Sequence, residues 1–126
     1  MRQAVLIVDD NPDFCGVAAS ILRNEGFVVD EVSDARLAIA RLRTIAYAVV
    51  VVEPSPVAGF APVFDFLAGS EDALQHVVAA TTENDDDLVQ RLDDAGVFRV
   101  LHKPFARKAL SDAVRDCARN ARPLRP

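Results

Sequence analysis

The sequence predicts an α/β fold in which helices cover both faces of a five-stranded, doubly wound parallel sheet. Short apolar runs alternate five times with segments of helical periodicity. Most of these runs are apolar throughout, as expected of strands buried on both faces. Strict alternation of strand and helix favours parallel strands joined by right-handed crossovers. The 126 residues, of which 51% are hydrophobic, are enough for one domain with its own core.

The first strand is predicted at residues 4–8, where five apolar residues follow one another. Asn11 suits the N-cap of the next helix and Pro12 its first residue, because an Asn side chain accepts bonds from free N–H groups and proline lacks one. Apolar side chains then recur at helical spacing up to Gly26, which ends this helix. A second strand is predicted at residues 27–32.

The second helix is predicted to begin after Asp34, which can cap it, and to bury a face of alanine, isoleucine and leucine. Residues 47–52 are the third and most hydrophobic strand. A proline-rich loop follows at residues 54–62, and a short apolar helix is predicted around residues 63–67. Residues 77–80 are predicted to be the fourth strand.

The fourth helix is predicted to open at Asn84 and residues 85–87, since acids suit the positive end of a helix, and to stop at Gly96. The fifth strand is expected at residues 97–101. The last helix follows Pro104 and carries its apolar residues on one face.

Composition excludes several functional classes. The net charge of −5 argues against a nucleic-acid surface or binding to anionic membranes, which need clustered cations. The apolar run at residues 4–8 is too short for a signal peptide or a membrane span, so we expect a cytoplasmic protein. Cys15 and Cys117 lack metal or redox spacing and are interpreted as small buried hydrophobes. We predict a domain at residues 1–121 and a tail at 122–126.

Acidic residues, a threonine and a lysine follow four of the predicted strands. Asp9 and Asp10 follow the first strand, Glu53 the third, Thr81 the fourth and Lys103 the fifth. Ligands of such sheets bind outside the carboxyl ends of the strands, where these residues are expected to meet. Adjacent carboxylates repel one another without a cation nearby, and a hard dication prefers oxygen ligands. The pattern therefore predicts a pocket for a divalent cation and a phosphoryl group.

These motifs resemble the receiver domain of bacterial response regulators, the CheY-like family, over roughly Val5 to Cys117. The resemblance rests on Asp9-Asp10, the acid that ends the third strand, Thr81 and Lys103-Pro104-Phe105. It implies a flavodoxin-like topology with strand order 2-1-3-4-5. It also implies a two-component phosphorelay function, with a sensor histidine kinase or another signalling protein as partner.

The resemblance implies a role for each acid. In the family, the two acids after the first strand and an Asp at the end of the third hold Mg²⁺, and that Asp accepts a phosphoryl group. Asp10 is then a direct Mg²⁺ ligand, Asp9 a ligand through water, and Glu53 stands at the phosphoacceptor position as a third ligand. A carboxylate nucleophile forms an acyl phosphate, and the dication neutralises charge during the transfer.

The remaining implied roles belong to the fourth and fifth strands. Thr81, with Thr82 as the alternative, and Lys103 are expected to bind phosphoryl oxygens. The bond before Pro104 is expected to be cis, as in the family. His102 is interpreted as a strand residue that faces a helix rather than as a ligand or phosphosite.

Glu53 is the main departure from the family pattern. Its extra methylene moves the carboxylate outward by roughly 1.5 Å, about one C–C bond. A displacement of that size costs on the order of 100-fold in a geometrically demanding reaction. Glu53 can instead pair permanently with Lys103 and imitate the phosphorylated state.

Two further departures touch the same function. Pro56 and Gly59 follow Glu53 at shorter spacing than in the family, which puts the metal ligand expected from the Ser55 carbonyl in doubt. Val100 replaces the aromatic residue whose inward swing reports phosphorylation.

The first hypothesis is a stand-alone, atypical receiver that binds Mg²⁺ weakly and acts through protein–protein contacts. Its contact face is expected at the fourth helix, fifth strand and fifth helix, and it is expected to be a monomer or weak dimer. It is not an enzyme, and autophosphorylation from a phosphodonor is lost or weak. The alternatives are a conventional Mg²⁺-dependent phosphoacceptor with altered geometry, and a receiver fragment of a larger regulator or hybrid kinase. A cofactor-binding enzyme is disfavoured because no glycine-rich turn follows the first strand.

Overall fold

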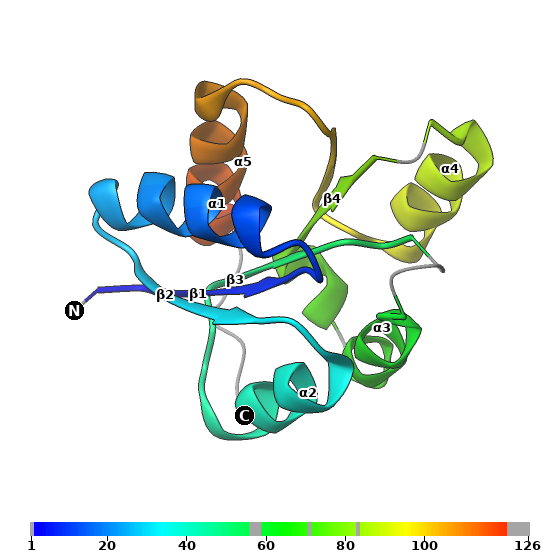
Figure 1. Ribbon diagram of the computed structural model, residues 1–126. Coiled ribbons are helices and arrows are strands. Elements are labelled where there is room, and N and C mark those ends of the chain that lie inside the picture. The colour runs from blue at the N-terminus through cyan, green and yellow to red at the C-terminus, as the bar shows by residue number, and fades with distance from the viewer. Residues whose placement is uncertain (1, 56–58, 71, 83, 121–126) are drawn as a thin grey trace.

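A computed structural model describes residues 2–55, 59–70, 72–82 and 84–120 and shows the predicted doubly wound fold (Figure 1). All neighbouring strands are parallel, and their order is β2-β1-β3-β4-β5, which confirms the predicted topology. The strands are β1 (Ala4–Val8), β2 (Val28–Val32), β3 (Val49–Val52), β4 (Val77–Thr81) and β5 (Arg99–His102). The helices are α1 (Pro12–Asn24), α2 (Ala35–Thr44), α3 (Ala61–Ala68), α4 (Asp86–Ala95) and α5 (Arg107–Asn120), with a short 3₁₀ helix η2 (Ala73–His76) before β4.

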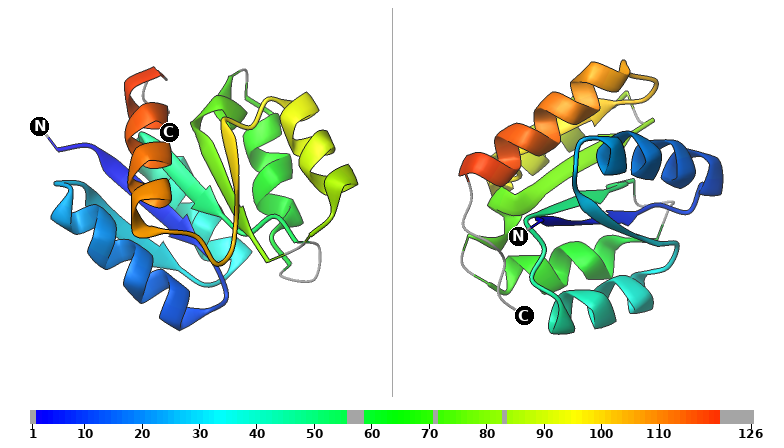
Figure 2. Two further views of the ribbon diagram at one scale, coloured as in Figure 1. Left: turned by 90° about the horizontal axis from the view of Figure 1, so that it is seen from above. Right: turned by 90° about the vertical axis from the view of Figure 1, so that its left-hand side faces the viewer.

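The helices form two layers, one on each face of the sheet (Figure 2). Helices α1 and α5 pack on one face, where their apolar residues join one side of β1, β3 and β4. Helices α2, α3 and α4 cover the other face and form a second apolar cluster. Because both faces are covered, the central strands β1, β3 and β4 are almost completely buried, as their unbroken apolar runs predict.

The edge strands are less apolar and less buried. In β2, apolar and acidic residues mix, and Val28 is exposed. In β5, three residues are half-buried and His102 is exposed. An edge strand has a neighbour on one side only, so its side chains need not be apolar throughout.

Two predicted helix starts are found as expected. The Asn11 side chain accepts hydrogen bonds from the backbone N–H groups of Asp13 and Phe14. The Asp34 side chain caps α2 by accepting a bond from the N–H of Leu37. Among the residues predicted to open α4, Asp85 is the N-cap and Asp86 the first helical residue, whereas Asn84 precedes the cap.

Glycine ends two helices in the predicted manner. Gly26 and Gly96 have φ angles of 97° and 102°, the left-handed region that allows a chain to leave a helix.

Several predicted boundaries shift by one or two residues. The third strand begins at Val49 rather than at residue 47, and the Tyr47 ring packs in the core of the α2–α3–α4 face while its hydroxyl donates to Asp30. The fifth strand begins at Arg99 rather than at residue 97, because the N–H of Val97 still bonds Leu92 O at the end of α4. Helix α3 starts before the predicted range and includes Pro62 in its first turn, where proline needs no donor. The 3₁₀ helix before β4 was not predicted.

Two further observations bear on function. Cys15 and Cys117 are buried and free, as predicted. Within the described part of the chain, no helix is long and apolar enough to cross a membrane. The predicted tail at residues 122–126 lies outside the described residues.

Candidate functional site

The carboxyl end of β1 places Asp9 in the interior of the molecule. Its N–H donates to Val32 O of the neighbouring strand at 3.2 Å, so its backbone continues the sheet by one bond. The residue is only 1% exposed, and its Oδ1 accepts a bond from the Asn11 N–H at 2.9 Å. Asp10, in contrast, is exposed. The two adjacent acids therefore have different environments, and only Asp9 is fixed inside the pocket.

Glu53 leaves β3 beside Asp9 and is also buried. Its N–H donates to Val8 O at 3.1 Å, which anchors the backbone, and the residue is 5% exposed. The Oε1 atom accepts two hydrogen bonds of 3.1 Å, from the Ser55 N–H and from the Thr81 hydroxyl. The Oε2 atom accepts no hydrogen bond from the described residues and lies 3.5 Å from Lys103 Nζ.

Lys103 reaches both carboxylates from the loop after β5. Its N–H donates to Thr81 O at 2.7 Å, and the bond to Pro104 is cis. The ammonium lies 2.5 Å from Asp9 Oδ2 and 4.0 Å from the centre of the Phe14 ring. With 14% of its side chain exposed, Lys103 is a nearly buried cation between two acids and an aromatic face.

Electrostatics sets the charge of this cluster. Burial is the main cause that raises the pKa of Glu53 above its ordinary value, while Lys103 and the bonds from Thr81 and Ser55 oppose it. Two carboxylates share one ammonium, so the cluster has a formal charge of −1 when all three groups are ionised. The arrangement holds the Lys103 ammonium in place and leaves one buried carboxylate oxygen, Glu53 Oε2, without a hydrogen-bond donor among the described residues.

The three predicted Mg²⁺ ligands are not arranged around one common ion position in this structure. Asp10 is exposed, whereas Asp9 and Glu53 both contact the Lys103 ammonium. Among the described residues, no three His, Cys, Asp or Glu side chains gather closely enough to hold one metal ion. A cation at this position would have to displace the ammonium from Asp9.

The other residues singled out from the sequence lie around this cluster. Thr82 and His102 are exposed. Val100 is half-buried and packs against the apolar cluster of the α2–α3–α4 face. Ser55 is buried and contributes its N–H to Glu53, whereas Pro56 lies outside the described residues.

Sequence reasoning missed the aromatic residues of the site. The Phe14 ring lies under the Lys103 ammonium and meets Phe105 edge to face, with ring centres 6.0 Å apart. A signal was present, because Phe14 is in the first turn of the helix that follows Asp9 and Phe105 is two residues after Lys103.

A thiol also lies close to the acids. The Cys15 Sγ donates to the Asp9 carbonyl at 3.4 Å. Burial, followed by the nearby acids, raises the pKa of this thiol to about 11, so it stays protonated and unreactive.

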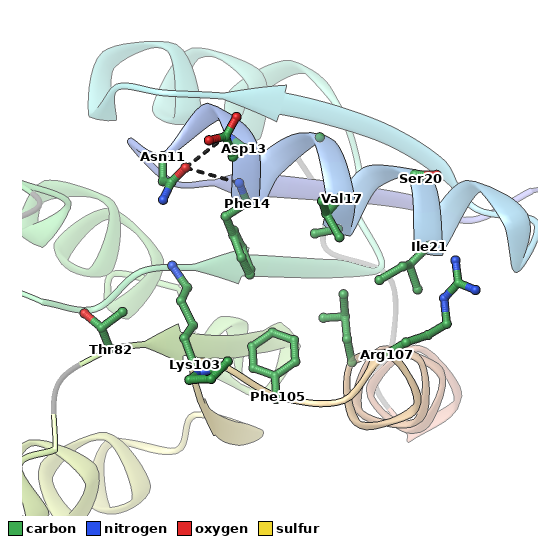
Figure 3. A pocket seen from close by; sticks show the side chains of 14 residues that line it. Asn11, Asp13, Phe14, Val17, Ser20, Ile21, Thr82, Lys103, Phe105 and Arg107 are labelled. Carbon is green, nitrogen blue, oxygen red and sulfur yellow. Dashed lines mark hydrogen bonds between the residues drawn. The ribbon is translucent and has the colours of Figure 1, made fainter.

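Beside Lys103, a groove of about 880 Å³ runs between α1 and α5 (Figure 3). Phe14, Val17 and Ile21 line it from α1, and Phe105 lines it from the opposite side. Val17 is 62% exposed. Apolar surface therefore continues outward from the aromatic pair at the site.

Known proteins resemble this chain in sequence pattern and in fold. The sequence model of the response regulator receiver domain matches residues 5–115. None of the curated proteins matches the sequence significantly. Three solved structures illustrate the likeness in fold, which is all that identities below 25% can show.

The chemotaxis response regulator CheY4 of Vibrio cholerae is 22% identical, with a TM-score of 0.76 over 93% of this chain and 99% of that one. A two-component response regulator from Clostridium difficile is 20% identical, with a TM-score of 0.79 over 94% of this chain and 98% of that one. The receiver domain of the sensor histidine kinase PA1611 from Pseudomonas aeruginosa PAO1, described with a magnesium ion in its active-site cleft, is 24% identical. Its TM-score is 0.78 over 95% of this chain and 100% of that one.

Proposed function

Because this chain belongs to the response regulator receiver domain family, we propose that it is an atypical signalling module of a two-component system. In this proposal Glu53 holds the site in one state without phosphorylation. The module then acts through protein–protein contacts and has no enzymatic activity of its own. Autophosphorylation from a phosphodonor is lost or weak.

One observation carries this proposal. Thr81 and Lys103, the residues that bind phosphoryl oxygens in the family, both contact the Glu53 carboxylate. The same carboxylate accepts the N–H of Ser55 in the loop that follows β3. Glu53 thus makes, through its own oxygens, contacts that the family makes through a phosphoryl group.

The longer side chain also works against phosphorylation. Glu53 Oε1 already accepts two hydrogen bonds, and Oε2 lies beside the Lys103 ammonium. A phosphodonor would have to break these contacts inside a pocket where the residue is 5% exposed. Misplacement by about 1 Å costs on the order of 100-fold in such reactions.

Mg²⁺ binding is proposed to be weak for the same reason. The receiver domain of PA1611 is described with magnesium in its cleft, and this chain has the corresponding acids Asp9 and Asp10. Here the ammonium of Lys103 pairs with Asp9, so a cation competes with a charge of the same sign. A titration with millimolar Mg²⁺, followed by NMR shifts of the Asp9 and Asp10 amides, is expected to show binding without saturation.

The proposed contact face consists of α4, β5 and α5. It includes the exposed edge of the sheet, where β5 residues are only half-buried, and the acidic outer side of α4. A sensor histidine kinase or another signalling protein is the proposed partner.

The test is incubation of the protein with Mg²⁺ and acetyl phosphate, followed by intact-mass measurement. The unmodified mass is expected to remain, because Glu53 is a poor acceptor at this position. The Glu53→Asp variant is the matched control, since it restores the family's shorter acceptor. A stoichiometric phosphoryl adduct on the unaltered chain would sink the proposal.

A conventional phosphoacceptor with altered geometry is the second candidate. The observation in its favour is Glu53 Oε2, which accepts no hydrogen bond from the described residues, so its lone pairs are not engaged in one. This candidate predicts that Glu53→Asp raises the rate of phosphorylation and that Lys103→Ala abolishes the response. No change in either variant counts against it.

A third candidate is a receiver segment of a larger regulator or hybrid kinase. PA1611 illustrates such an architecture, because its receiver is a domain of a sensor histidine kinase. Immunoblotting of the native protein distinguishes the candidates, since a stand-alone module migrates at 13.7 kDa and a fragment's parent migrates well above it.

A further inference from the structure

The outer surface of the layer formed by α2, α3 and α4 has opposite charges at its two sides. Figure 1 shows the three helices in this order along one side of the sheet. Helix α2 carries three arginines and no acid, whereas α4 carries four aspartates and one arginine. Helix α3 lies between them, and its one charged residue is Asp65. We call this outer surface the α2–α3–α4 surface.

The charges on α2 and α4 are spaced alike. Arg36 and Arg43 are seven residues apart on α2, and Asp86 and Asp93 are seven residues apart on α4. Seven residues make two turns and a rise of about 10.5 Å, so each pair forms one stripe. All four residues are exposed. A stripe of two cations and a stripe of two anions therefore have matching lengths.

Two of these four charges lie at the end of the helix that disfavours them. Arg36 is in the first turn of α2, at the positive end of the helix dipole, and Asp93 is in the last turn of α4, at the negative end. Neither has an ion-pair partner among the described residues, and the same holds for Arg43 and Asp86. Helix stability alone does not account for their placement.

The region between the stripes is largely apolar. Ala61, Pro62 and Ala68 of α3 are exposed, and Phe64 and Phe66 are partly exposed. Asp65 is also exposed and is the one charge in this central region. Arg43 lies over the Phe66 ring at 5.6 Å, which joins the basic stripe to this apolar centre. An apolar centre with charged sides is the common design of a protein–protein interface.

We propose that the α2–α3–α4 surface binds a second copy of this chain about a two-fold axis that lies between the two copies and runs alongside α3. In this arrangement α2 of each copy faces α4 of the other. The contact between a basic stripe and an acidic stripe therefore occurs twice in the dimer. Two-fold symmetry brings the positive side of each copy against the negative side of the other. Because both copies use the same surface, the assembly closes as a dimer. The pairs are exposed, so the dimer is weak and sensitive to salt.

Sedimentation velocity with a charge-swap pair of variants tests the proposal. Arg36→Glu with Arg43→Glu places anions opposite anions in the homodimer, and Asp86→Arg with Asp93→Arg places cations opposite cations. Each double variant is expected to dimerise at least about tenfold more weakly than the unaltered chain. When the two variants are mixed one to one, they are expected to form a heterodimer. In that heterodimer each α2 stripe again faces an α4 stripe of opposite charge.

The control is Lys108→Glu with Arg119→Glu on α5. It lowers the net charge by the same amount as the double arginine variant, but its residues lie in the other helix layer. It is expected to dimerise as the unaltered chain does, and circular dichroism checks that all variants fold. At about 10 mM salt, where the screening length is about 30 Å, the dimer is expected to be more populated than at 1 M. A monomer at near-millimolar concentration and low salt, or a mixture that stays monomeric, overturns the proposal. Growth into larger assemblies overturns the two-fold closure.

Discussion

Charged residues occur in two contrasting regions of this molecule. At the carboxyl ends of the strands, Asp9 and Glu53 are buried, and both contact the half-buried Lys103 ammonium. On the α2–α3–α4 surface, Arg36 and Asp93 are exposed and have no ion-pair partner among the described residues. In the proposed function, the first region sets the state of the module without a phosphoryl group. The second is available to another molecule, so the two regions respond to different perturbations.

The largest expected effect comes from removing the cation of the buried cluster. Lys103→Met leaves Asp9 and Glu53 buried without a counter-charge and is expected to destabilise the protein by about 3–5 kcal/mol. Urea unfolding at neutral pH measures this free energy.

The matched control is Lys108→Met, because the Lys108 ammonium is exposed and, among the described residues, pairs only with Asp112. Its expected cost is below about 0.5 kcal/mol. Equal losses in the two variants would remove the distinction between the buried and exposed regions.

Removing the aromatic face under Lys103 is expected to have a smaller effect. Phe14→Leu retains apolar volume but deletes the ring 4.0 Å from the ammonium and the edge-to-face contact with Phe105. We expect a loss of about 1–2 kcal/mol in the free energy of unfolding. In the Lys103→Met background the same substitution should cost clearly less, which a double-mutant cycle measures. Full additivity would show that the ring and the ammonium do not interact.

The pH dependence of stability isolates Glu53. Burial raises the pKa of its carboxyl in the folded state, so the folded protein binds more protons than the unfolded chain between the two pKa values. The contribution of Glu53 to stability is therefore greatest below its unfolded pKa and declines as the pH rises through its folded pKa. Each unit of pKa difference corresponds to about 1.4 kcal/mol.

Unfolding of the unaltered chain and of Glu53→Gln, which does not titrate, is to be compared from about pH 4 to 8. The unaltered chain should lose stability relative to the variant as the pH rises. The opposite slope would mean that Lys103 outweighs burial.

The smallest effect is expected on the α2–α3–α4 surface. Arg36→Ala removes an exposed cation from the positive end of α2 and should change the stability of the monomer by less than about 0.5 kcal/mol in dilute solution. Thermal unfolding measures this change. A loss above 1 kcal/mol would reveal an intramolecular role for this residue and weaken the contrast with the buried cluster.

Much of the fold was predictable from the sequence because the apolar runs of β1, β3 and β4 reflect burial on both faces. Helix starts were predictable where one side chain decides them, as at Asn11 and Asp34. Boundaries were harder at residues whose tertiary role overrides local preference. Tyr47 is apolar enough for a strand, yet it lies before β3, where its ring packs in the core and its hydroxyl donates to Asp30.

The site was predictable in composition and partly in pairing, since the ion pair of Glu53 with Lys103 was expected. The order of motifs along parallel strands brought Asp9, Glu53, Thr81 and Lys103 to one edge of the sheet. It could not show that Asp9 is buried while Asp10 is exposed. The two side chains are chemically identical, so their exposure depends on the backbone geometry of the loop. Nor did it show that Lys103 contacts Phe14, because this contact depends on how α1 packs beside the loop after β5.

The central claim is that Glu53 keeps Thr81 and Lys103 in one state without a phosphoryl group. The most direct test is a ¹H–¹⁵N NMR spectrum recorded before and after addition of Mg²⁺ and acetyl phosphate. For the unaltered chain we predict that the amide signals of Thr81 and Lys103 change no more than Mg²⁺ alone changes them. A new set of signals that requires acetyl phosphate and disappears as it is consumed would contradict the claim.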